Sequence, residues 1–205
     1  MKAKPSNGEP GTPRPPRPGG GLRRDWFGRF GLPLALLGIG LALSLSAPGF
    51  LTTQNLLIVA RQIAINAILA VGVTFVLLTG GVDLSLGSVV ALAGVTAASF
   101  AHPGDWPVLV PVLVGVGTGM VCGGINGVIV TRGRVAPFIV TLGMMTAARG
   151  LALVLSRGRP VSNLSREFTW LGSADVLGVP VPVWILIGVS VASFVFLRHF
   201  RWGRY

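Results

Sequence analysis

The residues best suited to chemistry lie in one short stretch, TGGVDLS, at positions 79–85. Gly80 and Gly81 interrupt an apolar run, and the oxygens of Asp83 and Ser85 can each accept a backbone N–H at a helix start. A carboxylate between two apolar segments is costly unless it caps a helix, is paired or meets water. The stretch therefore predicts a helix cap in a tight turn or, as the alternative, a helix break at a pathway or moving joint.

Four further polar residues lie within apolar surroundings and are candidates for lining a pathway. Gln62 and Asn66, together with Arg61, stand near the start of one apolar segment, and Asn126 and Arg149 lie inside two later ones. Polar side chains are disfavoured in hydrocarbon, so we expect all of them to face the bundle interior or water. Hydrogen bonding between helices is the alternative role for the same residues.

Bond-making chemistry has little support in the sequence. The two histidines, His102 and His199, are far apart and lack neighbouring ligands, so we expect no metal site and no Ser-His-Asp arrangement. No phosphate-binding GxxxxGK[ST] loop is present. The single cysteine, Cys122, is interpreted as a small apolar filler. We predict no catalytic residues and no cofactor.

The elements that must position these residues are apolar helices. Hydrophobic residues make up 51% of the chain and charged residues 11%, whereas soluble domains carry about 25% charged residues. Apolar segments long enough, or nearly long enough, to cross a bilayer occur at six places: residues 30–45, 58–78, 86–100, 108–130, 135–155 and 181–197. We predict an all-α, polytopic membrane helix bundle of about six transmembrane helices.

Residues 1–29 differ from the remainder of the chain. They are rich in Pro, Gly and Arg and poor in apolar residues, a composition typical of disorder. We predict a disordered basic tail over residues 1–29 and a transmembrane domain over residues 30–205. The tail is interpreted as a topological signal, with an anchor to anionic lipid as the alternative.

The net charge of +11 is distributed as membrane topology requires. If the N-terminus is cytoplasmic, the cytoplasmic segments hold twelve Lys and Arg residues and the opposite loops hold three. This positive-inside bias predicts cytoplasmic N- and C-termini. The basic residues flank apolar segments and do not form a soluble face, so we expect no nucleic-acid partner.

A stripe of small residues runs along the fourth apolar segment. Gly115, Gly119, Gly123 and Gly127 are spaced by four, which places them on one helix face. Missing side chains let another helix backbone approach closely. We predict a tight helix–helix contact along this stripe, with a narrow pathway lining as the alternative.

Two longer stretches identify a family resemblance. The run FLTTQNLLIVARQIAINAILAVGVTFVLLTGGVDLSLGSVVALAG and the run GGINGVIVTRGRVAPFIVTLGMMTAARGLALVLSRGRPV resemble the permease subunits of ribose- and xylose-type ABC importers. The resemblance extends from about Phe50 to Tyr205. TGGVDLS, INGVIVT and PFIVTLGMM together are specific, although each alone is a weak signal.

The resemblance implies import of a monosaccharide across the bacterial inner membrane. It also implies a cytoplasmic ABC ATPase subunit, a periplasmic sugar-binding protein and a second permease subunit as partners, with ATP hydrolysis on the ATPase. We further expect Asp83 to be required for transport. In this family, GRY usually leads into an ATPase-docking loop and later helices, so a chain that stops at Tyr205 is expected to be the N-terminal part of a permease.

Three alternatives remain. A truncated permease could act as a non-transporting membrane scaffold, and the same family includes importers of branched-chain amino acids. A secondary transporter is disfavoured because Asp83 is the sole carboxylate candidate for ion coupling within the membrane.

Overall fold

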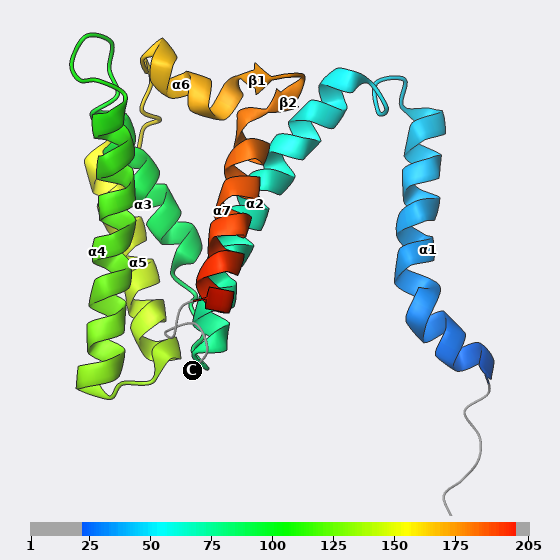
Figure 1. Cartoon of the computed structure of the whole chain (residues 1–205), viewed down its shortest axis with the longest axis horizontal. Coiled ribbons are helices and arrows are strands. Elements are labelled where there is room, and N and C mark those ends of the chain that lie inside the picture. The colour runs from blue at the N-terminus through cyan, green and yellow to red at the C-terminus, as the bar shows by residue number, and fades with distance from the viewer. Residues whose placement is uncertain (1–21, 200–205) are drawn as a thin grey trace, which may run out of the picture. The chain divides into compact units, whose positions relative to one another are not determined.

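The chain forms a set of apolar helices, seen here in a computed structural model that describes residues 22–199. The all-α class is confirmed. The fold also contains one β-hairpin, whose two strands have two residues each. In chain order (Figure 1) the elements are α1 Leu22–Ser46, α2 Thr53–Leu78, α3 Leu86–Ser99, α4 Leu109–Gly133, α5 Pro137–Ser156, α6 Arg166–Ser173, β1 Asp175–Val176, β2 Val179–Pro180 and α7 Val181–His199.

The chain divides into two units, Met1–Leu51 and Thr52–Tyr205, and each is described by itself. In the first unit, α1 begins at Leu22 and includes Pro33. The helix thus begins before residue 30, where the transmembrane domain was predicted to start, and the disordered tail stays a prediction. The predicted tail over residues 1–21 and the C-terminal GRY sequence lie outside the described residues.

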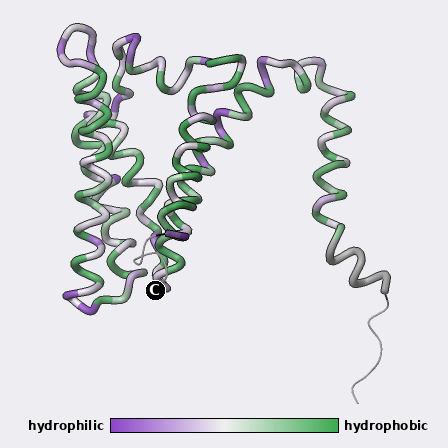
Figure 2. The backbone as a smooth tube through the Cα atoms, in the orientation of Figure 1, coloured by the Kyte–Doolittle hydropathy of each residue, from purple (hydrophilic) through white to green (hydrophobic). Residues whose placement is uncertain are grey.

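Six helices correspond to the predicted transmembrane segments. Helices α2, α4, α5 and α7 are long and apolar enough to cross a membrane, and Phe30–Ser46 and Leu86–Ser99 are shorter apolar helices. Figure 2 shows that hydrophobic residues dominate them along their length. Helix α2 begins at Thr53, before the predicted residue 58, because the Thr52 hydroxyl accepts the Asn55 backbone N–H at 3.4 Å.

Within residues 52–199, helices pack in two groups. Helix α3 packs against both α4 and α5, and α2 packs along α7 (Figure 1). The first group has a small core of Leu92, Cys122, Ala148 and Ala152. In the second group the rings of Phe75 and Phe196 lie 6.0 Å apart. Large apolar side chains outside these contacts are exposed, as lipid-facing residues of a membrane protein are.

The segment between α5 and α7 has structure that the sequence analysis missed. It lies outside the six predicted apolar segments, and it contains α6 and the β1–β2 hairpin. Helix α6 starts after Ser165, whose hydroxyl accepts the Phe168 N–H at 3.3 Å. The Ser165 N–H in turn donates to the Ala101 carbonyl at 2.7 Å. These bonds fix the start of α6 beside the end of α3.

Candidate functional site

The end of α2 fixes the start of the candidate site. Gly80 has a φ of +75°, a conformation that glycine adopts without strain. The Gly80 N–H donates to the Leu77 carbonyl at 3.0 Å and the Gly81 N–H to the Val76 carbonyl at 3.1 Å. This pair of bonds is a Schellman motif, which satisfies orphan carbonyls and ends the helix. The chain then leaves α2 in a defined direction.

Helix α3 is too short to cross a bilayer alone. Its 14 residues span about 21 Å, against a hydrocarbon core of about 30 Å. Residues 81–85, which precede it, are neither helical nor in a strand. Non-helical backbone at membrane depth is tolerated only where protein or water satisfies its polar groups. The non-helical residues 81–85 therefore need hydrogen-bond partners from the protein where they are withdrawn from water.

Asp83, Ser85 and Asn126 supply a chain of hydrogen bonds at this break. The Asp83 Oδ1 atom accepts the Ser85 backbone N–H at 2.7 Å and the Ser85 hydroxyl at 2.6 Å. The Asn126 Nδ2 atom donates to Ser85 Oγ at 3.2 Å. Contrary to the prediction, the Ser85 side chain caps no helix N–H. It joins the carboxylate to α4 and is 1% exposed.

Thr141 joins the network to α5, and sequence reasoning missed it. Its hydroxyl donates to the Val82 carbonyl at 3.3 Å, and the residue as a whole is 4% exposed. Threonine within an apolar helix usually bonds to the preceding turn, so its type gives no signal of a contact 59 residues away. The break is thus held by α4 and α5 together.

Asn126 retains an unsatisfied acceptor at this site. The residue is 7% exposed, and its Oδ1 atom is buried without a hydrogen-bond partner among the described residues. Leaving a buried acceptor unpaired costs about 1–3 kcal/mol. The Oδ1 atom of Asn126 is therefore an unused acceptor within the network.

The remaining three pathway candidates lie outside this network. Gln62 and Asn66 are exposed on α2, one turn apart and so on the same helix face. Arg149 lines a groove between α3 and α5. The structure therefore brings Asp83, Ser85 and Asn126 together and leaves the other candidates apart.

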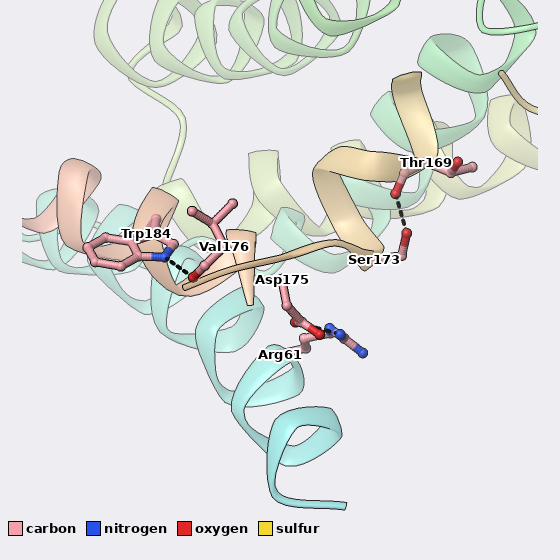
Figure 3. A network of polar contacts seen from close by, with 6 residues as sticks. All are labelled: Arg61, Thr169, Ser173, Asp175, Val176 and Trp184. Carbon is pink, nitrogen blue, oxygen red and sulfur yellow. Dashed lines mark hydrogen bonds and ion pairs between the residues drawn. The ribbon is translucent and has the colours of Figure 1, made fainter. Parts of the chain in front are cut away.

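A second polar cluster lies near the start of α2 (Figure 3). The Arg61 Nη2 atom meets the Asp175 Oδ1 atom at 2.7 Å, with side chains 25% and 34% exposed. The Trp184 ring N–H donates to the Val176 carbonyl at 3.3 Å. These contacts attach the hairpin to α2 and α7. Arg61 and Asp175 are 114 residues apart, which explains why the sequence did not reveal the pair.

The glycine stripe of α4 makes a close contact at one position. A Cβ atom on Gly115 would lie 3.2 Å from Ala97 Cβ, in α3. A Cβ atom on Gly119, Gly123 or Gly127 would meet no described atom within 4 Å. The close helix approach is therefore local to Gly115 in this chain, and the role of the lower stripe stays a prediction.

At the helix break, hydroxyl, amide and carboxylate groups bond to one another. Among the described residues, no group of three or more His, Cys, Asp or Glu residues could hold a metal ion.

Comparison with known proteins gives the family. The model of the family described as "Branched-chain amino acid transport system / permease component" matches residues 55–205. The chain belongs to this permease family. With its apolar helices, the permease is a multi-pass membrane protein. No solved structure matches it.

Curated relatives of the permease carry sugar-transport names. The ribose import permease of Escherichia coli K12 is 43% identical over 176 residues, which are 84% of this chain and 54% of the relative. The ribose import permease of Bacillus subtilis 168 is 40% identical, covering 83% and 53%. The D-allose transport system permease of E. coli K12 is 34% identical, covering 88% and 55%. The chain spans about half the length of these relatives.

Proposed function

We propose that this chain is part of the transmembrane permease subunit of an ABC transporter that imports a monosaccharide across the bacterial inner membrane. The observation that carries the proposal is the 43% identity to a ribose import permease over 84% of the chain. A separate cytoplasmic subunit would hydrolyse ATP, a periplasmic binding protein would deliver the sugar, and a second permease subunit would complete the pathway.

The polar groups of the helix break are compatible with an uncharged substrate. Ser85, Asn126 and Thr141 carry hydroxyl and amide groups, and Asp83 lies between two apolar segments that themselves contain no acidic residue. Sugar hydroxyls both donate and accept hydrogen bonds, so neutral groups can bind them without coupling ions. We propose that Asp83, Ser85 and Asn126 hold the break in the geometry that transport requires, with Gln62, Asn66 and Arg149 as further pathway candidates.

The orientation is part of the same proposal. Twelve basic residues on one side and three on the other favour a cytoplasmic N-terminus. The loops after α3 and α5 meet through Ser165 and Ala101, which supports their placement on one side of the membrane.

A chimera tests the function. Residues 1–205 would be fused to the part of the E. coli ribose import permease that this chain does not match, in a strain lacking that permease. We expect the chimera to restore uptake of labelled ribose, and we expect an Asp83→Asn chimera at equal membrane abundance to lose most of it. A strain with an ATPase unable to hydrolyse ATP is the control and should take up no ribose.

Two results would contradict the proposal. Uptake of labelled leucine without ribose uptake would favour the amino-acid alternative, which the family description names. A chimera that reaches the membrane, binds the ATPase and transports neither solute would favour the non-transporting scaffold.

A further inference from the structure

A groove lies between α3 and α5, and the hydrogen bonds of the helix break do not explain it. It has a volume of about 490 Å³ and is lined on α3 by Ser88, Ala91 and Val95 and on α5 by Arg149, Ala152 and Ser156. The members on each helix recur every three to four residues, so each helix contributes one continuous face. Small side chains along both faces leave room for a third helix to approach.

Arg149 gives this groove a charge. It lies about 10 Å from the Ser156 end of α5 and about 18 Å from the Pro137 end. Its guanidinium has no hydrogen-bond or ion-pair partner among the described residues, unlike that of Arg61. A cation at this depth is costly unless it meets an anion or water. The groove is therefore complementary to a helix that carries a negative charge.

Among the side chains that the structure describes, a second copy of this chain offers no such charge. Among the residues whose side chains the structure describes, the acidic ones are Asp83, Asp105, Glu167 and Asp175. Asp83 is bound by Ser85 and Asp175 by Arg61. Asp105 lies in the loop before α4, and Glu167 lies in the short helix α6. None of these offers a free carboxylate within a membrane-spanning helix.

We propose that the α3–α5 groove seats a transmembrane helix bearing an Asp or Glu at mid-depth, which pairs with Arg149. The source is the part of the permease that the relatives have and this chain does not match, since the chain covers 54% of the ribose import permease. The proposal rests on membership of the permease family and is independent of which solute is transported.

Model peptides test the seat directly. The full chain with Cys122→Ser and a fluorescent donor on Ser162→Cys, which is exposed in the loop after α5, would be reconstituted in phosphatidylcholine vesicles. Acceptor-labelled 21-residue polyleucine helices would carry Glu, Gln or Leu at their centre, a length of about 20 residues being sufficient to span. We expect the Glu helix to associate about tenfold more tightly than the Gln helix.

Variants assign the effect to Arg149. Arg149→Gln should abolish the preference for the Glu helix, and Arg149→Lys should retain it, which also guards against a folding defect. Arg132→Gln, which removes an exposed cation at the end of α4, is the matched control and should change nothing. Equal binding of the Glu and Gln helices, or a preference that survives Arg149→Gln, would overturn the proposal.

Two further outcomes would also overturn it. Loss of the preference when phosphatidylglycerol is added would identify a lipid phosphate as the occupant. Energy transfer between labelled copies of the chain that depends on Arg149 without any peptide would identify a second copy. This experiment measures peptide association and not sugar uptake. A negative result would therefore contradict the proposal about the groove and leave the proposed function untouched.

Discussion

Ser85 shows how a single hydroxyl can connect three parts of the permease. It donates to Asp83, accepts from Asn126 and starts the turn from which α3 continues. A hydroxyl that is 1% exposed has no access to water, so its partners must come from the protein. The roles of Asp83 and Asn126 are consequently linked through it.

We predict that Asp83→Ala loosens the helix break. It removes both bonds to Ser85 and leaves a buried donor unpaired, a loss of about 1–3 kcal/mol. Buried Cys122, one turn from Asn126, provides a probe. Maleimide should label Cys122 at least about tenfold faster in the variant under native conditions.

Asp105→Ala is the matched control for that variant, because it removes an exposed acid from the loop before α4. It should leave the labelling rate of Cys122 unchanged. If Asp83→Ala and Asp105→Ala label at the same rate, the Asp83–Ser85 contact does not hold the break.

Helix α3 is the central element of its group, since it touches both α4 and α5. The Thr96 and Thr118 hydroxyls lie 3.0 Å apart between α3 and α4. Ala97 of α3 faces Gly115 of α4. The α3–α4 contact therefore combines a polar pair with a close backbone approach.

We predict that Gly115→Leu separates α3 from α4. Even its Cβ atom would lie 3.2 Å from Ala97 Cβ, and overpacking of this kind costs about 1–3 kcal/mol. The purified 205-residue protein should melt at a lower temperature in detergent. Gly119→Leu meets open space at its Cβ and should change the melting temperature little. An equal fall in melting temperature in both variants would contradict a close helix contact confined to Gly115.

The Arg61–Asp175 pair attaches the hairpin to α2, and its partial exposure limits its strength. For side chains 25% and 34% exposed, solvent screening keeps the coupling of such a pair at about 0.2–1 kcal/mol. We predict a coupling in this range from Arg61→Gln, Asp175→Asn and the double variant, measured by unfolding in mixed detergent micelles. Strictly additive effects would show that the pair contributes nothing.

In the whole molecule, hydrogen bonds at both ends of α3 link this helix to the region of α5. Ser165 bonds to the end of α3 at one side. At the other side Thr141, near the start of α5, bonds to the segment before α3. Helices α3 and α5 thus run parallel, which is the relation expected when the consecutive membrane-crossing segments α3, α4 and α5 alternate in direction.

We predict that impermeant maleimide on intact cells distinguishes the two sides. In a Cys122→Ser background, Ser162→Cys should be labelled from outside, because its loop is expected to be extracytoplasmic. Ala136→Cys should be labelled only after the cells are opened, because the α4–α5 loop carries Arg132 and Arg134. Both positions are exposed in the fold. The reverse pattern would invert the proposed orientation.

The sequence by itself determined the class of the protein and the approximate bounds of its apolar helices. Hydropathy over about 20 consecutive residues is a local property, so each span was recognisable without its neighbours. Gly80 and Asp83 marked the end of α2 and the start of a new element for the same reason, since turn and cap preferences depend on adjacent residues.

Only the tertiary structure decided which polar residues meet. Asn126 reaches Ser85 across 41 residues and Thr141 reaches Val82 across 59, while Gln62 and Asn66 remain exposed. Side-chain type shows that a polar group needs a partner, but helix rotation and packing select that partner. For the same reason the sequence could place Arg149 within an apolar segment, and only the packing of α3 on α5 placed it in a groove.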